Sequence, residues 1–174
     1  MRRDADAERV RRFTRELGRA TDVPARLYLV GGASAVIERW RPTTLDIDLR
    51  LEPDDDRLLR EIVRLKERLD ISVELASPLD FLPELPGWRE RSPFLYREGV
   101  IDVFHLDFAS QALAKLERGF EQDLADVASM VAASVVDPAQ LLELYDRVED
   151  ELFRFPAVDP PSLRAAVERL AADG

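Results

Sequence analysis

The sequence predicts an α+β (α/β) fold, in which a mixed β-sheet core with flanking helices precedes a helical C-terminal portion. Short apolar runs, two of them alternating with period two, recur within the first 107 residues and indicate strands. A glycine pair joins one of these runs to a helix, and from Phe108 onward the pattern is helical. We therefore expect a core over residues 1–107 and a helical portion over 108–174, packed together as one compact unit.

The first element is an amphipathic helix over 5–19, because Val10, Phe13 and Leu17 recur at helical spacing and arginines occupy much of the remaining surface. An acidic run after Pro53 opens a later helix, where acids satisfy free backbone amides and complement the helix dipole. The predicted elements of the core are helix 5–19, strand 27–30, helix 33–40, strand 44–51, helix 54–69, strand 71–76 and strand 100–107.

Residues 77–99 are rich in proline and predict a loop or an irregular hairpin. They interleave Trp88, Phe94 and Tyr96 with arginines, a composition that can stack bases and hold phosphates. A packed loop that uses these aromatics as core is the favoured alternative. The remaining chain predicts helices over 108–118, 121–135, 138–153 and 161–172.

Composition limits the class of protein. The 174 residues are 46% hydrophobic, which allows one sizeable core, and they include no cysteine. No apolar run is long enough for a membrane span, and the N-terminus lacks a signal-peptide core, so we expect a cytoplasmic protein without a membrane partner. The net charge of −10 argues against non-specific coating of nucleic acid, although residues 1–20 carry seven arginines and four acids.

The most informative segment joins a strand, a glycine turn and two carboxylates. The apolar run 27–30 ends at Gly31 and Gly32, which let the backbone approach a phosphate. In Leu45-Asp-Ile-Asp-Leu49 the alternation places Asp46 and Asp48 on one face of a strand. Their mutual repulsion falls when a divalent cation lies between them. A solvated edge strand is the alternative interpretation of this pair.

A third carboxylate comes from the alternating run 71–76, in which Glu74 lies among apolar neighbours. Enzymes that transfer nucleotides hold two cations with carboxylates on neighbouring strands, and Asp46, Asp48 and Glu74 fit that need. The predicted cofactor is Mg²⁺, as two ions, with Mn²⁺ as an alternative.

Gly31-Gly32, thirteen intervening residues and then Asp46-Ile-Asp48-Leu49 resemble the signature of the nucleotidyltransferase superfamily related to DNA polymerase β. Within it, the chain resembles the small bacterial AbiEii and MenT toxin-type nucleotidyltransferases over roughly residues 25–130. The resemblance implies that the two glycines and Ser34 hold the triphosphate and that the two aspartates bind both metals.

The resemblance also implies that Glu74 completes the metal set. Glutamate departs from the commoner aspartate at that position, and Asp102 is the competing third acid.

A downstream segment supplies a second match to the toxin-type families, which carry a helix with a lysine, an arginine and one or two aspartates. Here Lys115 and Arg118 are three residues apart, and Asp123 and Asp126 follow. The two cations would clamp phosphates while an aspartate orients them. An ordinary surface ladder of charges is the alternative.

His105 is the single histidine of the chain. It could serve as a base for an attacking hydroxyl, but a strand histidine with satisfied hydrogen bonds is the favoured interpretation. The sequence contains no HExxH motif, Walker A lysine or zinc-ligand spacing, and no Ser-His-Asp order that supports a hydrolase.

The predicted activity is that of an NTP-dependent, pyrophosphate-releasing nucleotidyltransferase that moves an NMP to a hydroxyl acceptor. The resemblance implies the 3′ end of tRNA as acceptor and a toxin restrained by an antitoxin protein. Two other hypotheses are a protein or small-molecule acceptor, such as an aminoglycoside, and a non-catalytic module that binds a nucleotide or a partner.

Overall fold

The computed structural model describes residues 4–173. Backbone contacts divide the chain into two units, which we call unit 1 and unit 2. Unit 1 comprises Met1–Ser77 and Ser92–Leu106, and unit 2 comprises Pro78–Arg91 and Asp107–Gly174. The proline-rich segment 78–91 therefore groups with the C-terminal helices.

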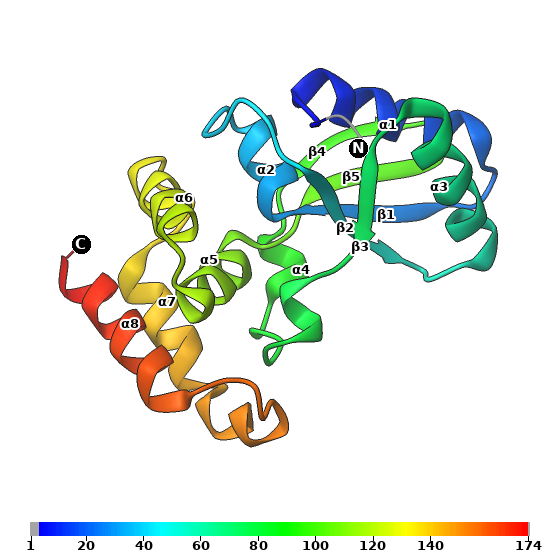
Figure 1. Cartoon of the computed structure of the whole chain (residues 1–174). Coiled ribbons are helices and arrows are strands. Elements are labelled where there is room, and N and C mark those ends of the chain that lie inside the picture. The colour runs from blue at the N-terminus through cyan, green and yellow to red at the C-terminus, as the bar shows by residue number, and fades with distance from the viewer. Residues whose placement is uncertain (1–3, 174) are drawn as a thin grey trace. The chain divides into compact units, whose positions relative to one another are not determined.

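Unit 1 is a five-stranded mixed sheet with three helices among its described residues (Figure 1). The strands follow the order β3-β2-β1-β5-β4, with β1 antiparallel to β2 and parallel to β5. Strand β3 is parallel to β2, and β4 is antiparallel to β5. Its elements are α1 (Ala7–Ala20), β1 (Ala25–Val30), α2 (Gly31–Ile37), β2 (Asp46–Glu52), α3 (Asp56–Leu69), β3 (Ser72–Leu75), β4 (Phe94–Glu98) and β5 (Ile101–His105).

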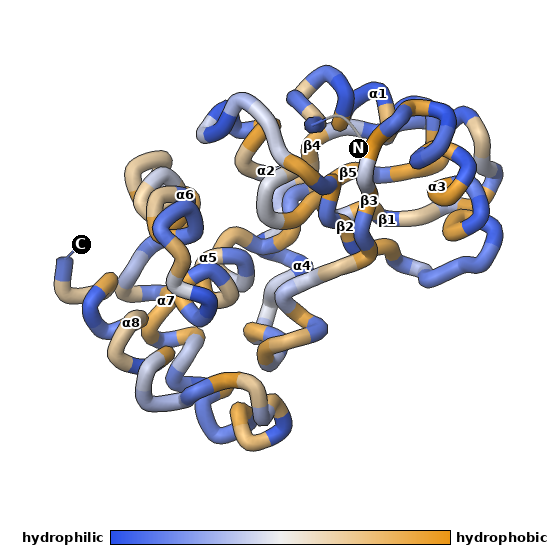
Figure 2. Tube along the Cα trace, in the orientation of Figure 1, coloured by the Kyte–Doolittle hydropathy of each residue, from blue (hydrophilic) through white to orange (hydrophobic). Residues whose placement is uncertain are grey.

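One face of this sheet forms the core with α1 and α3. Both helices are strongly amphipathic, and Figure 2 shows hydrophobic and hydrophilic segments alternating along them. The caps agree with the sequence, because Asp6 accepts from the backbone N–H of Arg9 and Asp55 from that of Arg57. The fully buried core side chains include Phe13, Leu17, Leu27, Leu29, Ile47, Leu49, Leu58, Leu65, Ile101 and Val103.

The other face of the sheet, which we call the open face, carries polar and aromatic side chains. Burial alternates along β2, with the odd-numbered residues 47, 49 and 51 buried and the four even-numbered residues half-buried. The even-numbered residues of β2 are Asp46, Asp48, Arg50 and Glu52. Because side chains alternate across a strand, these four share the open face.

Unit 2 is helical. The buried carboxylate of Asp107 caps α5 by accepting from the N–H groups of Ala109 and Ser110. Arg91 of α4 binds the same carboxylate through two nitrogens at 3.0 and 2.7 Å, which ties segment 78–91 to α5. The elements of unit 2 are η1 (Pro78–Asp80), α4 (Trp88–Arg91), α5 (Phe108–Arg118), α6 (Glu121–Ala132), α7 (Pro138–Asp146), η2 (Glu149–Arg154) and α8 (Pro160–Asp173).

One predicted helix is shorter in the structure. The helix predicted over 138–153 ends at Asp146, and a 3₁₀ helix follows it. Arg164 of α8 binds both Asp146 and Glu149, a long-range contact that residue periodicity does not encode. The region predicted as a loop or irregular hairpin contains strand β4, which forms an irregular antiparallel hairpin with β5, in agreement with the second alternative. Among the described residues, no helix is long and apolar enough to cross a membrane.

Candidate functional site

Asp46 and Asp48 lie on the open face of β2, and Glu74 lies beside them on β3. The Cα of Asp48 is paired in register with that of Glu74, and Asp46 is paired with Ser72. Both aspartates are half-buried, whereas Glu74 is exposed. The sheet therefore brings the three predicted carboxylates onto neighbouring positions of one surface.

The glycine turn adjoins this surface. Val30, the last residue of β1, is the register partner of Asp48, and α2 starts at the next residue, Gly31. Gly31 has a φ of +56°, and a Cβ built on it would lie 3.3 Å from Oδ2 of Asp48. Glycine suits both the left-handed backbone and the close carboxylate. The two parts of the sequence motif thus meet in space.

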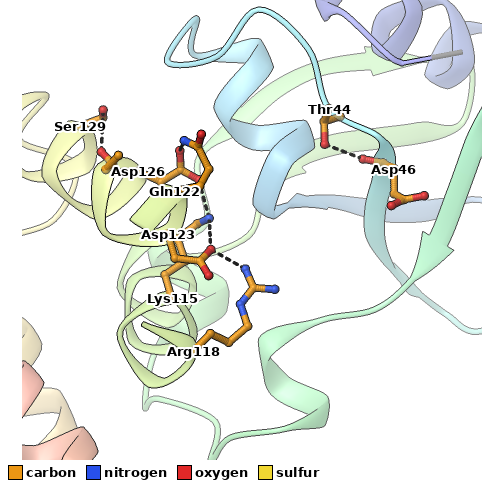
Figure 3. A network of polar contacts seen from close by, with 9 residues as sticks. Thr44, Asp46, Lys115, Arg118, Gln122, Asp123, Asp126 and Ser129 are labelled. Atoms are coloured by element: carbon orange, nitrogen blue, oxygen red, sulfur yellow. Dashed lines mark hydrogen bonds and ion pairs between the residues drawn. The ribbon is translucent and has the colours of Figure 1, made fainter. Parts of the chain in front are cut away.

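Gly32, Thr44 and Arg41 form the support of this turn. A Cβ on Gly32 would lie 2.1 Å from Oγ1 of Thr44 and 3.6 Å from a guanidinium nitrogen of Arg41. The Thr44 hydroxyl donates to the carbonyl oxygen of Asp46 at 3.1 Å (Figure 3). Thr44 therefore holds the glycine turn and the start of β2 together. Sequence reasoning missed Thr44 and Arg41, although they lie two and five residues before Asp46.

Gly32→Ala should destabilise the protein by about 1–3 kcal/mol, because its methyl group overlaps the Thr44 side chain. Chemical denaturation would measure the loss. Thr44→Ala removes the clashing hydroxyl, so the double variant should lose less stability than the two single losses added together. Additive losses would contradict the tight packing of Gly32 against Thr44.

Hard oxygen donors make this surface suitable for Mg²⁺, which carboxylates bind at octahedral sites completed by water and phosphate. Within residues 4–173, however, no group of three or more His, Asp or Glu side chains is arranged so that it could already hold a metal ion. Like charges on adjacent positions repel each other, so the side chains of Asp46, Asp48 and Glu74 would converge only around a cation. The chemistry of the donors fits the cation, and side-chain rotation must complete the site.

Asp102 lies in a different part of the open face. Its Cα partner on β1 is Arg26, four residues before Val30, which is the partner of Asp48. Its carboxylate accepts from Arg97 at 2.5 and 2.9 Å, and this hydrogen-bonded guanidinium lowers the pKa of Asp102. Register therefore favours Glu74 over Asp102 as the neighbour of Asp48.

Ser34 and His105 form a buried polar contact on the side of α2. The Ser34 hydroxyl, which is fully buried, donates to the carbonyl of Leu29 and lies 3.0 Å from Nδ1 of His105. Nε2 of His105 lies 2.7 Å from Oε1 of Glu38. The histidine is therefore a satisfied strand residue, as the sequence favoured. The role predicted for Ser34 at a triphosphate stays a prediction, and its hydroxyl already has protein partners.

Burial lowers the pKa of His105 below its ordinary value of about 6.5, and the Glu38 carboxylate partly opposes this shift. As pH falls, His105 therefore becomes protonated at a higher pH in the unfolded chain than in the folded protein. The free energy of unfolding should then decrease below about pH 6.5. NMR of the single imidazole should show a folded-state midpoint below the ordinary value. Glu38→Gln should lower that midpoint further, and an upward shift would contradict the assignment.

Lys115, Arg118, Asp123 and Asp126 form a network between α5 and α6 (Figure 3). Nζ of Lys115 lies 2.6 Å from Asp126 and 3.3 Å from Asp123, and Arg118 lies 2.6 Å from the same oxygen of Asp123. Lys115 and both aspartates are at most 4% exposed. The alternative of a surface ladder is therefore wrong for these three residues. Only the Arg118 side chain, which is 55% exposed, reaches solvent.

Arginines of helix α1 make contacts that stabilise the fold of unit 1. Arg9 of α1 donates to the carbonyls of Leu69 and Asp70 at the end of α3, and Arg11 lies over the ring of Tyr96. Helix α1 packs on the core face, opposite to the acidic residues. Trp88 is buried in unit 2, as the packed-loop interpretation expects, whereas Phe94 of the same region is 57% exposed, against that interpretation.

Two open cavities of about 540 and 530 Å³ lie in unit 1, and neither is lined by the three acids. The smaller one is lined in part by Trp40 and Arg41, close to the glycine turn in sequence. The larger one lies at the far end of the open face, beside Arg26 and Arg97.

Comparison with protein families identifies this chain. Searches of curated proteins and of solved structures found no match. A family model described as "Nucleotidyltransferase of unknown function (DUF6036)" matches residues 8–155, which include the strands with the three acids and the α5–α6 network. The chain belongs to this nucleotidyltransferase family.

Proposed function

We propose that this protein is a Mg²⁺-dependent enzyme that transfers an NMP from an NTP to a hydroxyl acceptor and releases pyrophosphate. The observation that carries the proposal is the meeting of Asp46, Asp48 and Glu74 on the open face with the backbone of Gly31. Membership of the nucleotidyltransferase family supports the same reaction class.

In the proposed reaction, Asp46, Asp48 and Glu74 would hold the cations, which neutralise the triphosphate and assist attack by the acceptor hydroxyl. The half-buried aspartates supply carboxylate oxygens, which are the ligands that Mg²⁺ prefers. Gly31 keeps side-chain bulk away from Asp48, so a phosphate could approach a cation bound to that carboxylate from this side.

Within the α5–α6 network, Arg118 is the group available to bind a phosphate, because its guanidinium is both exposed and oriented by Asp123. Lys115 lies between two buried aspartates and would act through them, as the group that holds Asp123 and Asp126 in place. The sequence predicted that Lys115 and Arg118 both contact phosphate. In the present proposal only Arg118 does so, and Lys115 holds the aspartates in place.

The proposed acceptor is RNA, at the 3′ end of tRNA, and the proposed biological role is that of a toxin restrained by an antitoxin. Both follow from the resemblance to AbiEii and MenT toxin-type enzymes. The net charge of −10 requires that any RNA contact be local. Helix α1 is a weak candidate for that contact, since it packs on the face opposite to the acids.

Incubation of the protein with each α-labelled NTP, Mg²⁺ and total tRNA, followed by denaturing electrophoresis, tests the proposal. Label on RNA would support the whole proposal and identify the nucleotide. Label on protein would support nucleotide transfer to a protein side chain in place of RNA. Absence of label on RNA, on protein and on small-molecule acceptors would contradict the proposed activity and favour a binding module.

A further inference from the structure

Three aromatic side chains cross the open face of unit 1 next to the acidic residues. The rings of Tyr28 and Phe104 are stacked with centroids 5.3 Å apart, and Phe94 meets Phe104 edge to face at 5.4 Å. The guanidinium carbon of Arg26 lies 5.8 Å from the centroid of the Phe104 ring. We call Tyr28, Phe104 and Phe94 the aromatic row.

Strand register places the aromatic row beside the acids. On β1, Val30 is the partner of Asp48, and Tyr28, two residues earlier, is the partner of Phe104 on β5. Two residues along a strand correspond to roughly 7 Å, and positions two apart share a face. The aromatic row therefore runs across the same face as Asp48, one step further along the strands.

An irregularity in β4 directs Phe94 to this face. Phe94 pairs with Phe104, but Tyr96 pairs with Val103, so the register shifts between them. The Tyr96 hydroxyl lies 3.1 Å from that of Thr14 in α1, which places Tyr96 on the core face. In a regular strand, residues 94 and 96 would share a face. Bulges of this kind redirect side chains near functional sites.

The end of the aromatic row is accessible and has arginines beside it. Phe94 is 57% exposed, whereas Tyr28 at the other end of the row is 1% exposed. The next positions of the open face hold Arg26 and Arg97, both exposed, which line the cavity of about 540 Å³. An exposed aromatic ring with arginines next to it is the composition that binds single-stranded nucleic acid by stacking.

We propose that Phe94 and Phe104 form a stacking platform for an unpaired base of a single-stranded RNA acceptor, with Arg26 and Arg97 near its phosphates. This inference rests on the proposed function, because it makes the open face the surface along which the acceptor reaches Asp48. The platform accepts any base, since every base offers an aromatic face.

Distance favours an RNA strand over the base of the donor nucleotide. Three strand spacings separate β2 from β4, which corresponds to roughly 14 Å. This distance exceeds the separation between the α-phosphate and the base of one nucleotide, so the base of a donor whose α-phosphate lies at Asp48 does not reach the exposed ring of Phe94. A strand of a few nucleotides spans the distance and brings its end to the acids.

Fluorescence anisotropy with a labelled single-stranded RNA of about twelve nucleotides, in EDTA and without NTP, tests the platform. Phe94→Ala should weaken binding by about 5- to 100-fold, the range for loss of one stacked base. Phe94→Trp should bind within about twofold of wild type, because it keeps the stacking face. Phe153→Ala is the matched control, since Phe153 is also exposed, at 78%, and lies in unit 2.

Two arginine contacts predict a shallow salt dependence, with a slope of about −1.4 for log K against log salt. A duplex RNA of equal length should be insensitive to Phe94→Ala. Failure of wild type to bind the single strand, or equal affinities for Phe94→Ala and Phe153→Ala, would overturn the platform.

The binding assay is independent of chemistry, so the two proposals can fail separately. If RNA binding depends on Phe94 but no NTP is used, the proposed transferase fails and the platform stands. If label is transferred to RNA while Phe94→Ala changes neither affinity nor KM for RNA, the platform fails and the transferase stands.

Discussion

Replacing Asp48 with asparagine is expected to lower nucleotide transfer by at least about 100-fold, because even indirect metal-site substitutions cost 10- to 100-fold. Asparagine keeps nearly the same shape but removes a charge at the centre of the proposed site, between Glu74 on β3 and the turn at Gly31. The label assay measures the effect at saturating NTP and Mg²⁺.

A matched control for Asp48→Asn is Asp54→Asn, which removes an exposed carboxylate before helix α3 and should keep the wild-type rate. Circular dichroism and thermal unfolding should show that Asp48→Asn keeps its fold. A folded Asp48→Asn variant with the wild-type rate would refute the placement of the metal site at β2.

The largest effect on stability is expected at Lys115. Lys115→Met would leave Asp126 without its ammonium partner at 2.6 Å, in a site where the carboxylate is 1% exposed. Removal of one partner from a buried ion pair typically costs about 3–5 kcal/mol. For a chain of this size the melting temperature should then decrease by on the order of 10 °C. Thermal and chemical denaturation both measure this loss.

The other lysine of the chain provides the control. Lys66 is half-buried on α3, and Lys66→Met should change stability by no more than about 0.5 kcal/mol. In the double variant Lys115→Met/Asp126→Leu, the carboxylate that lost its ammonium partner is gone, while Arg118 still binds Asp123. Much of the lost stability should return. Equal stability of Lys115→Met and wild type would show that the network is not a structural ion pair.

Variants of Lys115 and Arg118 also distinguish whether Lys115 binds phosphate directly or only holds the aspartates in place. If Lys115 only holds the aspartates, Arg118→Ala should raise the KM for NTP without a large change in stability, because the Arg118 side chain is 55% exposed. If Lys115 itself binds phosphate, the double variant that restores stability would still use NTP poorly.

Local patterns in the sequence were sufficient to predict most strands of the sheet and the face on which the two aspartates lie. Alternation along 45–49 predicted that Asp46 and Asp48 share a face, and β2 shows this alternation in its burial. The reason is that a strand has a fixed period of two, so one face of it can be read directly from residue order. The N-terminal caps, including Asp55 before α3, are local in the same way.

Contacts between distant segments required the tertiary structure. Strand order placed Glu74, and not Asp102, beside Asp48, because which strands are neighbours depends on packing of the whole sheet. The ion pair between Arg164 and Asp146 at the end of α7, and the fit of Gly32 against Thr44, appeared only in three dimensions.

The sequence by itself therefore determined the class of fold, the strand that carries the two aspartates and the nucleotidyltransferase resemblance. Tertiary structure decided that Lys115 is buried between two carboxylates and that Phe94 is directed to the open face by a shift of register. The physical reason is that periodicity reports which side of an element a residue occupies. Burial and pairing depend on which other element lies against that side.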